Sequence, residues 1–465
     1  MPYPDKTQSI PLYQQLYETL KAEILSQNRK PGEKLPAIRA YARTMGVSVS
    51  TVVEAYALLA SEGYIVSRKG SGHFVRKLDT IIYRPHPSAA SPMPPEPEQK
   101  VYRFRMNPAI FDRNLISLRS VRRMLDDSMA KTHSMRYAGA GEPFGSPAFR
   151  KSIADQLQQS MGFHCTYRQI IVTSALHQCF NILSKELKQV HGVHMIGVEN
   201  PSPKSLRIYL ESNDIRTVPL PISSREAAIR ELHRTGCKVL LLMPNHQIPT
   251  GSFLPLEERI RLLNWANQED GLIIEFDDEA GLRYHGKPVQ TLKSLDRTDR
   301  VIYIGSTRNT YLPGLRTHYL VLPENWYPSM SRRFALYSPN IPSFLQDAYQ
   351  QMVSSGDWNR HLRHLNTQFA KRHNTFTELL QQKLSPDYEL LGTGAGIFFR
   401  IRSLRGRSEE WMIRRADSVG VQVFPVSDYW DPIDTYRFDQ VLLGFAHYTS
   451  EDLTIVSGLL QQAWM

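Results

Sequence analysis

Ile302-Tyr-Ile-Gly-Ser-Thr-Arg-Asn-Thr-Tyr-Leu-Pro-Gly-Leu-Arg316 joins an apolar run to a polar turn and a basic end. The apolar run predicts a short buried strand that ends at Gly305. The turn contains Asn309, whose side-chain amide is neutral and not nucleophilic. Arg316, behind a Pro-Gly pair, offers a guanidinium that can grip a phosphate or carboxylate with two hydrogen bonds. The stretch therefore predicts an anion-binding turn at a strand end, with an amide at its centre.

Short runs of the same apolar character recur before and after this stretch, and they are expected to be strands buried on both faces. Their positions are 170–173, 195–198, 239–243, 271–274, 301–304 and 318–322. Helical stripes lie between them, which predicts an α/β layer with a mainly parallel sheet. Beyond Ser329 a long helical region leads to a smaller α+β unit, expected from about Asn374 and including residues 396–400 and 441–446.

Length and composition limit the possible classes of protein. The chain has 465 residues, which suggests two or three domains, and its hydrophobic content of 41% is enough for real cores. No apolar run approaches the roughly eighteen residues of a membrane span, and the first residues lack a signal peptide's apolar stretch. We therefore expect a cytoplasmic protein that makes no membrane contact.

The cysteines and the net charge add two further expectations. Cys165, Cys179 and Cys237 have no metal-ligand spacing, so we interpret them as reduced packing residues and predict no metal site. The net charge of +11 favours a polyanionic partner, although a basic protein without a nucleic-acid role remains compatible with it.

Three helical stripes and two strands are predicted at the start of the chain. The stripes are Tyr13, Leu16, Tyr17, Leu20 and Ile24; Ile38, Tyr41, Ala42 and Met45; and Val52, Val53, Tyr56, Leu59 and Ala60. Gly46 and Gly63 end the second and third helices. Residues 64–75 predict two short strands around a turn at Gly70 and Gly72. This order of elements is a winged helix-turn-helix.

The first part of the chain resembles the DNA-binding domain of the GntR family. The resemblance rests on Lys-Leu-Pro-Ala-Ile-Arg at 34–39, Gly-Val-Ser-Val-Ser-Thr-Val at 46–52, Ala-Tyr at 55–56, Glu-Gly-Tyr at 62–64 and Gly-Ser-Gly at 70–72. It implies DNA contacts from the start of the recognition helix, from the preceding helix and from the wing. The implied residues are Arg39, Ser48, Ser50, Thr51, Arg68, Lys69 and Gly70.

One position departs from the GntR pattern, because Val49 stands where the family usually has an arginine. The change could remove a guanine contact, or the valine could touch a thymine methyl group instead. Residues 1–77 hold eleven Lys/Arg against six Asp/Glu, a balance of +5. This excess favours DNA over a protein as the partner of the winged helix.

Residues 78–100 are rich in proline and poor in apolar residues, which predicts a semi-rigid tether. The tether would join a DNA-binding domain over 1–77 to a second domain over 101–465. The second domain resembles the aminotransferase-like domain of the MocR subgroup of GntR regulators. The resemblance covers nearly the whole chain and rests on segments at 144–150, 172–174, 199–201, 244–251, 274–277, 313–316, 361–363 and 443–446.

The MocR resemblance implies a large α/β domain of the fold-type I pyridoxal-phosphate (PLP) transferase kind, with a smaller α+β C-terminal subdomain. Asn309 matches the lysine that binds PLP covalently in this fold, so covalent PLP is not expected. Asp277 matches the partner of the pyridine nitrogen, and Asp278 replaces a tyrosine. The other implied residues of a cofactor or effector site are Ser174, Ser306, Arg308 and Arg316.

Further departures from the fold-type I pattern lie near the implied site. Ala175 replaces a glycine of the phosphate-binding turn, and Pro203 replaces an aromatic residue that stacks on the ring. Ile248 fits an apolar wall of the site or plain packing. Lys287 and Lys293 precede the strand that ends at Gly305, so they do not match the cofactor lysine.

We therefore expect a transcription regulator that binds double-stranded DNA, forms a homodimer and senses a small anionic or amino-acid-like effector. Its body would be catalytically inactive, with no catalytic residues. Noncovalent PLP and no ligand at all remain alternatives for the body. The rival from another class is a PLP-dependent aminotransferase with an accessory DNA-binding domain, and Asn309 discriminates the two. The operator, the effector and the direction of regulation are not encoded in any of these motifs.

Overall fold

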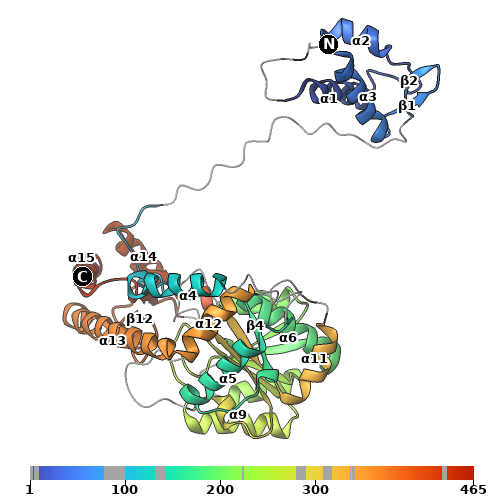
Figure 1. The fold of residues 1–465 in the computed structure, drawn as a ribbon. Coiled ribbons are helices and arrows are strands. Elements are labelled where there is room, and N and C mark those ends of the chain that lie inside the picture. Colours follow the sequence, from blue (N-terminus) through green and yellow to red (C-terminus); the bar gives the residue numbers. More distant parts are fainter. Residues whose placement is uncertain are drawn as a thin grey trace. The chain divides into compact units, whose positions relative to one another are not determined.

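The computed structural model describes residues 4, 10–77, 100–130, 142–221, 225–278, 290–306, 317–335, 337, 341–431 and 437–465. The chain divides into two compact units, Met1–Gln99 and Lys100–Met465 (Figure 1). The predicted tether lies outside the described residues except for its last residue. Arg308, Asn309 and Arg316 of the predicted site also lie outside them.

The first unit has the predicted order of three helices and a hairpin. The helices are α1 (Leu12–Leu25), α2 (Ile38–Met45) and α3 (Val49–Ser61), and the strands are β1 (Ile65–Arg68) and β2 (Gly72–Val75). The strands pair antiparallel from Ile65↔Val75 to Arg68↔Gly72. Gly46 ends α2 with φ of 64°, a left-handed conformation that favours glycine. The buried sides of the three helices meet in one core with Ile65 and Val75.

The predicted inner face of the third helix was wrong at one position. Val53 is 47% exposed, whereas Ala60 is partly buried against the core and Ala55 is fully buried. At 3.6 residues per turn, Val52, Ala55 and their neighbours on the next turn form the inner stripe. Val53 lies about 100° further round the helix from Val52, so it faces outward.

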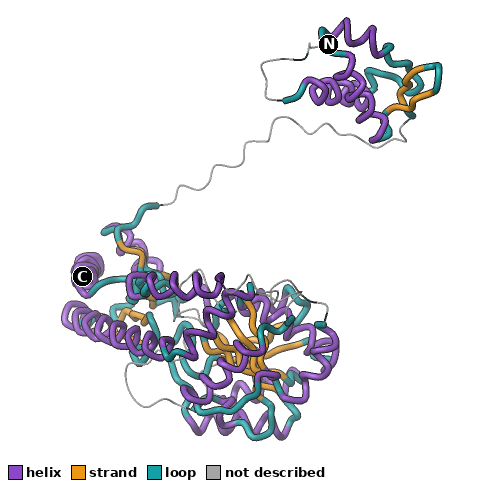
Figure 2. Tube along the Cα trace, viewed as in Figure 1, coloured by secondary structure: helices purple, strands orange, loops and turns teal. Residues whose placement is uncertain are grey.

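The body is built on a seven-stranded sheet in the order β4-β10-β9-β8-β7-β5-β6. Figure 2 shows strands in orange, with helices around those of the body. Its strands are β4 (Ile170–Thr173), β5 (Met195–Asn200), β6 (Arg216–Pro221), β7 (Val239–Leu242), β8 (Leu272–Asp277), β9 (Val301–Ser306) and β10 (His318–Val321). Only β10 runs against its neighbours, being antiparallel to both β4 and β9. The mainly parallel sheet and all six predicted strands are confirmed. The seventh strand, β6, was missed because it is an edge strand with half-exposed residues and two prolines.

Alternate residues of each strand enter different cores, which explains why the strands are continuously apolar. Ile302 and Ile304 pack with Phe180 of α6, while Tyr303 between them packs with Phe149 of α5. The helices around the sheet are α5 (Pro147–Met161), α6 (Leu176–His191), α7 (Lys204–Glu211), α8 (Arg225–Thr235), α9 (Leu256–Gln268), α10 (Leu292–Leu295), α11 (Tyr327–Arg333) and α12 (Ser343–Ser354). The sheet is therefore covered by helices on both faces.

A second, antiparallel sheet lies in the C-terminal part of the body. Its strands run in the order β11 (Tyr388–Leu391), β12 (Phe398–Ser403), β15 (Gln440–Gly444) and β14 (Phe424–Pro425). It packs with α13 (Asp357–Leu384), α14 (Glu409–Ser418) and α15 (Ser450–Trp464). The body also contains α4 (Leu118–Ala130), the parallel pair β3 (Phe104–Arg105) and β13 (Val421–Gln422), and short 3-10 helices.

The expected start of this smaller unit near Asn374 was wrong. Helix α13 runs unbroken from Asp357 to Leu384, so Asn374 lies well inside it. Phe369, Phe376 and Leu380 are fully buried along the helix, while Asn374 is an exposed polar position between them. A polar residue on the outer face of a helix does not mark a boundary.

Within the described residues, no single helix is both long and apolar enough to cross a membrane. The helices α2 and α3 reach that length and composition only when the bent pair is taken together.

Replacing Asn374 by proline tests the continuity of α13. Proline inside a helix removes a backbone hydrogen bond and clashes with the preceding turn, at a cost of about 3 kcal/mol or more. We expect the thermal unfolding midpoint of the body to fall clearly for Asn374→Pro. The control Asn374→Ala should change stability by less than about 0.5 kcal/mol. Equal midpoints for the two variants would contradict an unbroken helix.

Candidate functional site

The start of α3 carries a cluster of hydroxyl groups that the sequence placed at a DNA contact. Ser48 is the N-cap residue, and its Oγ accepts from the backbone N of Thr51 at 3.2 Å. The same Oγ lies 2.8 Å from Ser50 Oγ and 2.7 Å from Thr51 Oγ1. The structure thus brings the three predicted residues together, but their hydroxyls bond first to one another. Their main local effect is to fix the start of α3.

Three predicted basic residues lie exposed on two other elements of the same unit: Arg39 on α2, Arg68 at the end of β1 and Lys69 in the hairpin turn. The Arg68 guanidinium lies 4.9 Å from the centre of the Phe74 ring, a cation–π distance that orders the side chain. Gly70 has φ of +75°, as the tight turn of the wing requires.

The ion pairs of the first unit leave these basic side chains out. Among its described residues, the pairs are Lys21–Glu62 at 3.3 Å, Arg29–Glu23 at 2.6 Å and Arg29–Glu33 at 3.3 Å. The acidic residues of these pairs therefore bind basic residues of α1 and of the loop after it, not those of α2 or the hairpin. The positive charges of α2 and of the wing remain for an external polyanion.

The body holds a second candidate site at one edge of the large sheet. His318 of β10 pairs with Thr173 of β4 on one side and with Ser306 of β9 on the other. Asp277 of β8 pairs with Gly305, one residue before Ser306. Because β4, β8 and β9 run in the same direction, their carboxyl ends meet at this edge. The structure therefore brings Ser174, Asp277 and Ser306 to one edge, as the sequence predicted.

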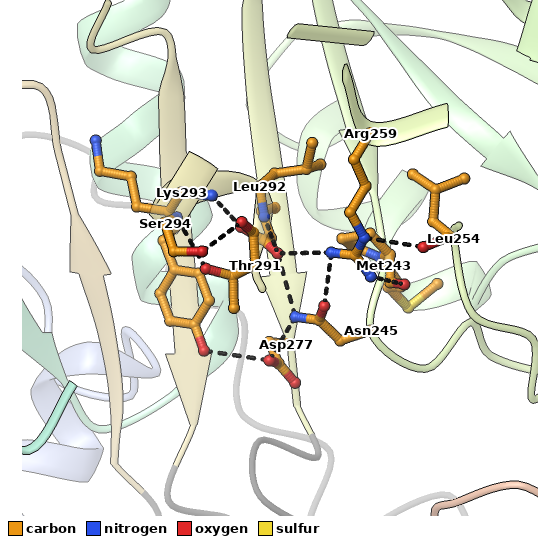
Figure 3. Close-up of polar contacts among 12 residues, drawn as sticks. Met243, Asn245, Leu254, Arg259, Asp277, Thr291, Leu292, Lys293 and Ser294 are labelled. Carbon is orange, nitrogen blue, oxygen red and sulfur yellow. Dashed lines mark hydrogen bonds and ion pairs between the residues drawn. The ribbon is translucent and has the colours of Figure 1, made fainter. Parts of the chain in front are cut away.

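Asp277 is held in a fixed position by two neutral donors. Its carboxylate is 6% exposed, and Oδ2 accepts from Asn245 Nδ2 at 2.8 Å and from the Tyr303 hydroxyl at 3.3 Å (Figure 3). Burial raises the pKa of Tyr303, and the nearby Asp277 charge raises it further. The phenol therefore stays neutral and remains a hydrogen-bond donor to the carboxylate.

A buried ion pair lies directly behind Asp277. Arg259 of α9 and Glu275 of β8 are both fully buried, with 3.9 Å between Nη1 and Oε1. Asn245 lies between them, accepting from Arg259 Nη1 at 2.9 Å and donating to Glu275 Oε1 at 3.1 Å. Such charges are tolerated in a protein interior only when most of their hydrogen-bonding capacity is used.

The remaining groups of both buried charges are bonded to the backbone. Arg259 donates through Nη2 to the Pro244 carbonyl at 2.8 Å and through Nε to the Leu254 carbonyl at 2.9 Å. Glu275 accepts from the backbone N of Leu292 at 3.1 Å and of Lys293 at 2.8 Å. The pair thus fixes both ends of the 244–254 loop and the start of α10.

Burial raises the pKa of Glu275 to about 7, and the backbone donors and Arg259 only partly offset this effect. Sequence reasoning missed Asn245, Arg259, Glu275 and Tyr303 as parts of the site. A signal was available, because Glu275 lies between Ile274 and Phe276 in an otherwise apolar strand. A carboxylate in such a strand requires a buried partner.

The other predicted residues of the body site have local roles. The backbone N and Oγ of Ser174 both donate to Gln178 Oε1, at 3.0 and 2.9 Å. Ala175 precedes α6 with φ of −152°, an extended conformation that any residue adopts. Asp278 is buried, with 9% of its surface exposed, and it follows Asp277 at the end of β8.

Two further expectations concerned apolar and basic side chains. Ile248 is partly buried and packs against both main cores of the body, consistent with plain packing. The Lys293 ammonium is bonded to Asp299 at 2.9 Å, so this lysine is already paired.

Two other residues named from the sequence have no described role in the site. Pro203 precedes α7 as its N-cap residue, and Lys287 lies outside the described residues.

Both parts of the chain are similar to known proteins. Residues 12–75 match the family described as "Bacterial regulatory proteins, gntR family". The chain is 29% identical to the uncharacterized HTH-type transcriptional regulator YdeL of Bacillus subtilis, covering 100% of this chain and 99% of that protein. It is also 29% identical to the probable rhizopine catabolism regulatory protein MocR of Rhizobium meliloti, covering 91% of this chain and 88% of that protein.

Among solved structures, the kynurenine aminotransferase of Pyrococcus horikoshii is similar, with a TM-score of 0.68 and 20% identity. The match covers 79% of this chain and 91% of the enzyme. At this identity the likeness concerns the fold alone. The chain therefore combines an N-terminal GntR-type helix-turn-helix domain with a large aminotransferase-like domain of fold type I.

The raised pKa of Glu275 predicts a pH-dependent stability that Glu275→Gln should abolish. The neutral carboxyl is favoured in the folded protein, so its stabilising contribution is complete below pH 4.5 and is lost as the pH rises through 7. The loss should be on the order of 3 kcal/mol, from about 1.4 kcal/mol per unit of pKa shift. Urea unfolding at pH 5 and pH 8 measures it.

Glutamine does not titrate, so the wild type should lose stability relative to Glu275→Gln between pH 5 and pH 8. The exposed Glu410→Gln serves as the matched control and should follow the wild type at both. A constant difference between wild type and Glu275→Gln would contradict the prediction.

Proposed function

We propose that this protein is a transcription regulator in which the first unit binds double-stranded DNA and the body senses a small effector without catalysing transamination. The observation that carries the DNA-binding part is the distribution of charge in the first unit. Basic side chains on α2 and the wing flank α3, while the acidic residues of this unit's ion pairs are bound to Lys21 and Arg29. The similarity to proteins named as HTH-type transcriptional regulators supports the same conclusion. Such a regulator acts in the cytoplasm.

The fold raises the question of PLP, and the described residues fit one part of that cofactor. The buried Asp277 at a strand end could hold a protonated pyridine nitrogen, since Asn245 and Tyr303 both keep its carboxylate in place. When bound in such folds, PLP acts as an electron sink for amino-acid chemistry. Residue 309 is an asparagine, and an amide cannot form the covalent link. We therefore propose that the body is catalytically inactive, rather than an aminotransferase with an accessory DNA-binding domain.

We favour an anionic or amino-acid-like effector over noncovalent PLP. Asp277 and Asp278 place two acidic residues at the strand end, where a positively charged amino group would be attracted and a phenolate-like oxygen repelled. Ser174 and Ser306 lie at the same edge and can bond a carboxylate or phosphate. Arg308 and Arg316 would supply the cations for that anion.

We further propose that the protein is a homodimer that presents two helix-turn-helix units to two half-sites. Effector binding would change the closure of the body and thereby the way in which the two units engage DNA. The effector can shift this equilibrium only by its difference in affinity for the two states.

Salt dependence tests the DNA contacts of Arg39 and Arg68. If each neutralises one phosphate, removing it should reduce the slope of log affinity against log salt by about 0.9. Fluorescence anisotropy of Arg39→Ala and Arg68→Ala over a salt series, with a DNA selected by the wild type, measures this slope. Lys21→Ala is the control, because Lys21 is paired with Glu62, and its slope should equal the wild-type slope. Unchanged affinity of the Arg39→Ala, Arg68→Ala double variant would refute the assignment.

Residue 309 tests the absence of covalent cofactor chemistry. After incubation with PLP and borohydride reduction, peptide mass mapping should find no adduct at Asn309, whereas exposed lysines react weakly. Asn309→Lys should give at most a weak adduct and no useful transamination, since Asp278 and Pro203 remain. A tight adduct in this single variant would mean that the site still fits PLP, and our preference for another effector would then be wrong.

Light scattering tests the homodimer. At micromolar concentration and without DNA, the mass should be about twice the chain mass of 53.4 kDa. A mass equal to that of one chain would exclude the proposed pairing of two helix-turn-helix units.

A further inference from the structure

Two large apolar side chains of α3 face solvent. Val49 is 46% exposed and Val53 is 47% exposed, although the other valine of the helix, Val52, is completely buried. Residues four apart lie on the same side of a helix, so the two exposed valines form one apolar flank at its start. Their methyl groups are about 6 Å apart along the helix axis, at 1.5 Å per residue.

The polar groups beside this flank are already engaged. Ser48 Oγ lies within hydrogen-bond distance of the hydroxyls of both Ser50 and Thr51 and caps the helix at the same time. A hydroxyl that is bonded inside the protein must exchange that bond before it can read a base. The valine methyl groups make no hydrogen bond, so the apolar flank can be buried against a partner without the loss of one.

The charges around the flank indicate what would cover it. Arg39 and Arg43 on α2, and Arg68 and Lys69 on the hairpin, are exposed and do not appear in the ion pairs of the described part of this unit. An apolar protein partner would have to bury these cations or supply matching acids. A DNA duplex supplies phosphates on both sides of a groove that is wide enough for a helix, so it satisfies cations and flank together.

The major groove offers a matching apolar group. Thymine alone among the four bases carries a methyl group there, and adjacent base pairs are about 3.4 Å apart. An axial separation of about 6 Å between Val49 and Val53 therefore spans one or two base steps. The valine side chain cannot form a hydrogen bond with a base. It therefore offers no interaction that would favour guanine, cytosine or adenine over thymine.

We propose that α3 recognises thymine methyl groups through Val49 and Val53, so that each half-site contains two thymines within three consecutive base pairs. This inference rests on the proposed DNA binding and adds the chemical class of base that the helix selects. Arg39, Arg68 and Lys69 hold the phosphates, and the two valines supply specificity.

Replacing thymine by uracil tests the inference, because it removes the major-groove methyl group and changes nothing else in the base pair. The full-length protein first selects duplexes from a random library, and each thymine of the selected half-site is then replaced by uracil. We expect two positions at which uracil weakens binding about fourfold, from about 0.8 kcal/mol per buried methyl-sized group. Fluorescence anisotropy at one fixed salt concentration measures the change.

Variants assign the effect to the two side chains. In the double variant Val49→Ala, Val53→Ala, the loss of affinity caused by uracil should disappear. Both side chains are exposed, so their truncation leaves the core intact. Ile10→Ala, which truncates another exposed aliphatic residue of the same unit, should keep the full penalty. Val49→Arg should change one preferred thymine to guanine, because arginine reads guanine through two hydrogen bonds.

The possible failures separate this inference from the proposed function. Selection of a defined sequence with no penalty for uracil at any position would overturn methyl recognition and leave DNA binding standing. A penalty that persists in the double alanine variant would remove the role of the two valines. Failure to enrich any duplex would overturn both the inference and the proposed function.

Discussion

The side-chain amide of Asn245 is the interaction on which the body site depends. It accepts from the buried Arg259 and donates to Glu275 and Asp277, so one uncharged group joins three ionisable side chains. Arg259 Nη1 and Glu275 Oε1 are 3.9 Å apart, too far for a direct hydrogen bond, and the amide links them through one hydrogen bond to each. The same bridge fixes the Asp277 carboxylate, which is the residue facing the proposed effector. The same hydrogen bonds therefore stabilise the edge of the sheet and fix the geometry of the site.

The first unit uses charge in the opposite way. In the body the charges behind Asp277 are buried and compensated, whereas on α2 and the wing they are exposed and face solvent. Exposed basic side chains contribute little to folding stability. We therefore interpret those of α2 and the wing as groups that bind a polyanion. Hydroxyl groups at the start of α3 stabilise the helix itself, and this leaves Val49 and Val53 as its distinctive outward chemistry.

Much of the fold could be predicted because local patterns and burial agree. The six short apolar runs became strands since each lies between two layers of helices, and Gly46 ended α2 where a left-handed residue was needed. The prediction failed where a pattern was ambiguous. Val53 is apolar but faces outward, Asn374 is polar but lies inside a helix, and β6 is an edge strand with prolines.

The candidate site was only half predictable. Ser174, Asp277 and Ser306 could be placed because strand ends of a parallel sheet meet at one edge. The partners of Asp277 could not, since Asn245 lies in a loop and the Tyr303 side chain belongs to a strand core. Their approach depends on the register between strands, which no local pattern contains.

The central claim is that a ligand of the body controls DNA binding by the first unit. A thermal-shift screen of vitamers, amino acids and phosphorylated metabolites would identify a compound that raises the unfolding midpoint. The decisive measurement is the affinity for the selected DNA with and without that compound, in the wild type and in Asp277→Asn. We predict that the compound changes the affinity of the wild type and leaves that of Asp277→Asn unchanged. A compound that stabilises the body through Asp277 but leaves DNA affinity the same in the wild type would contradict the account.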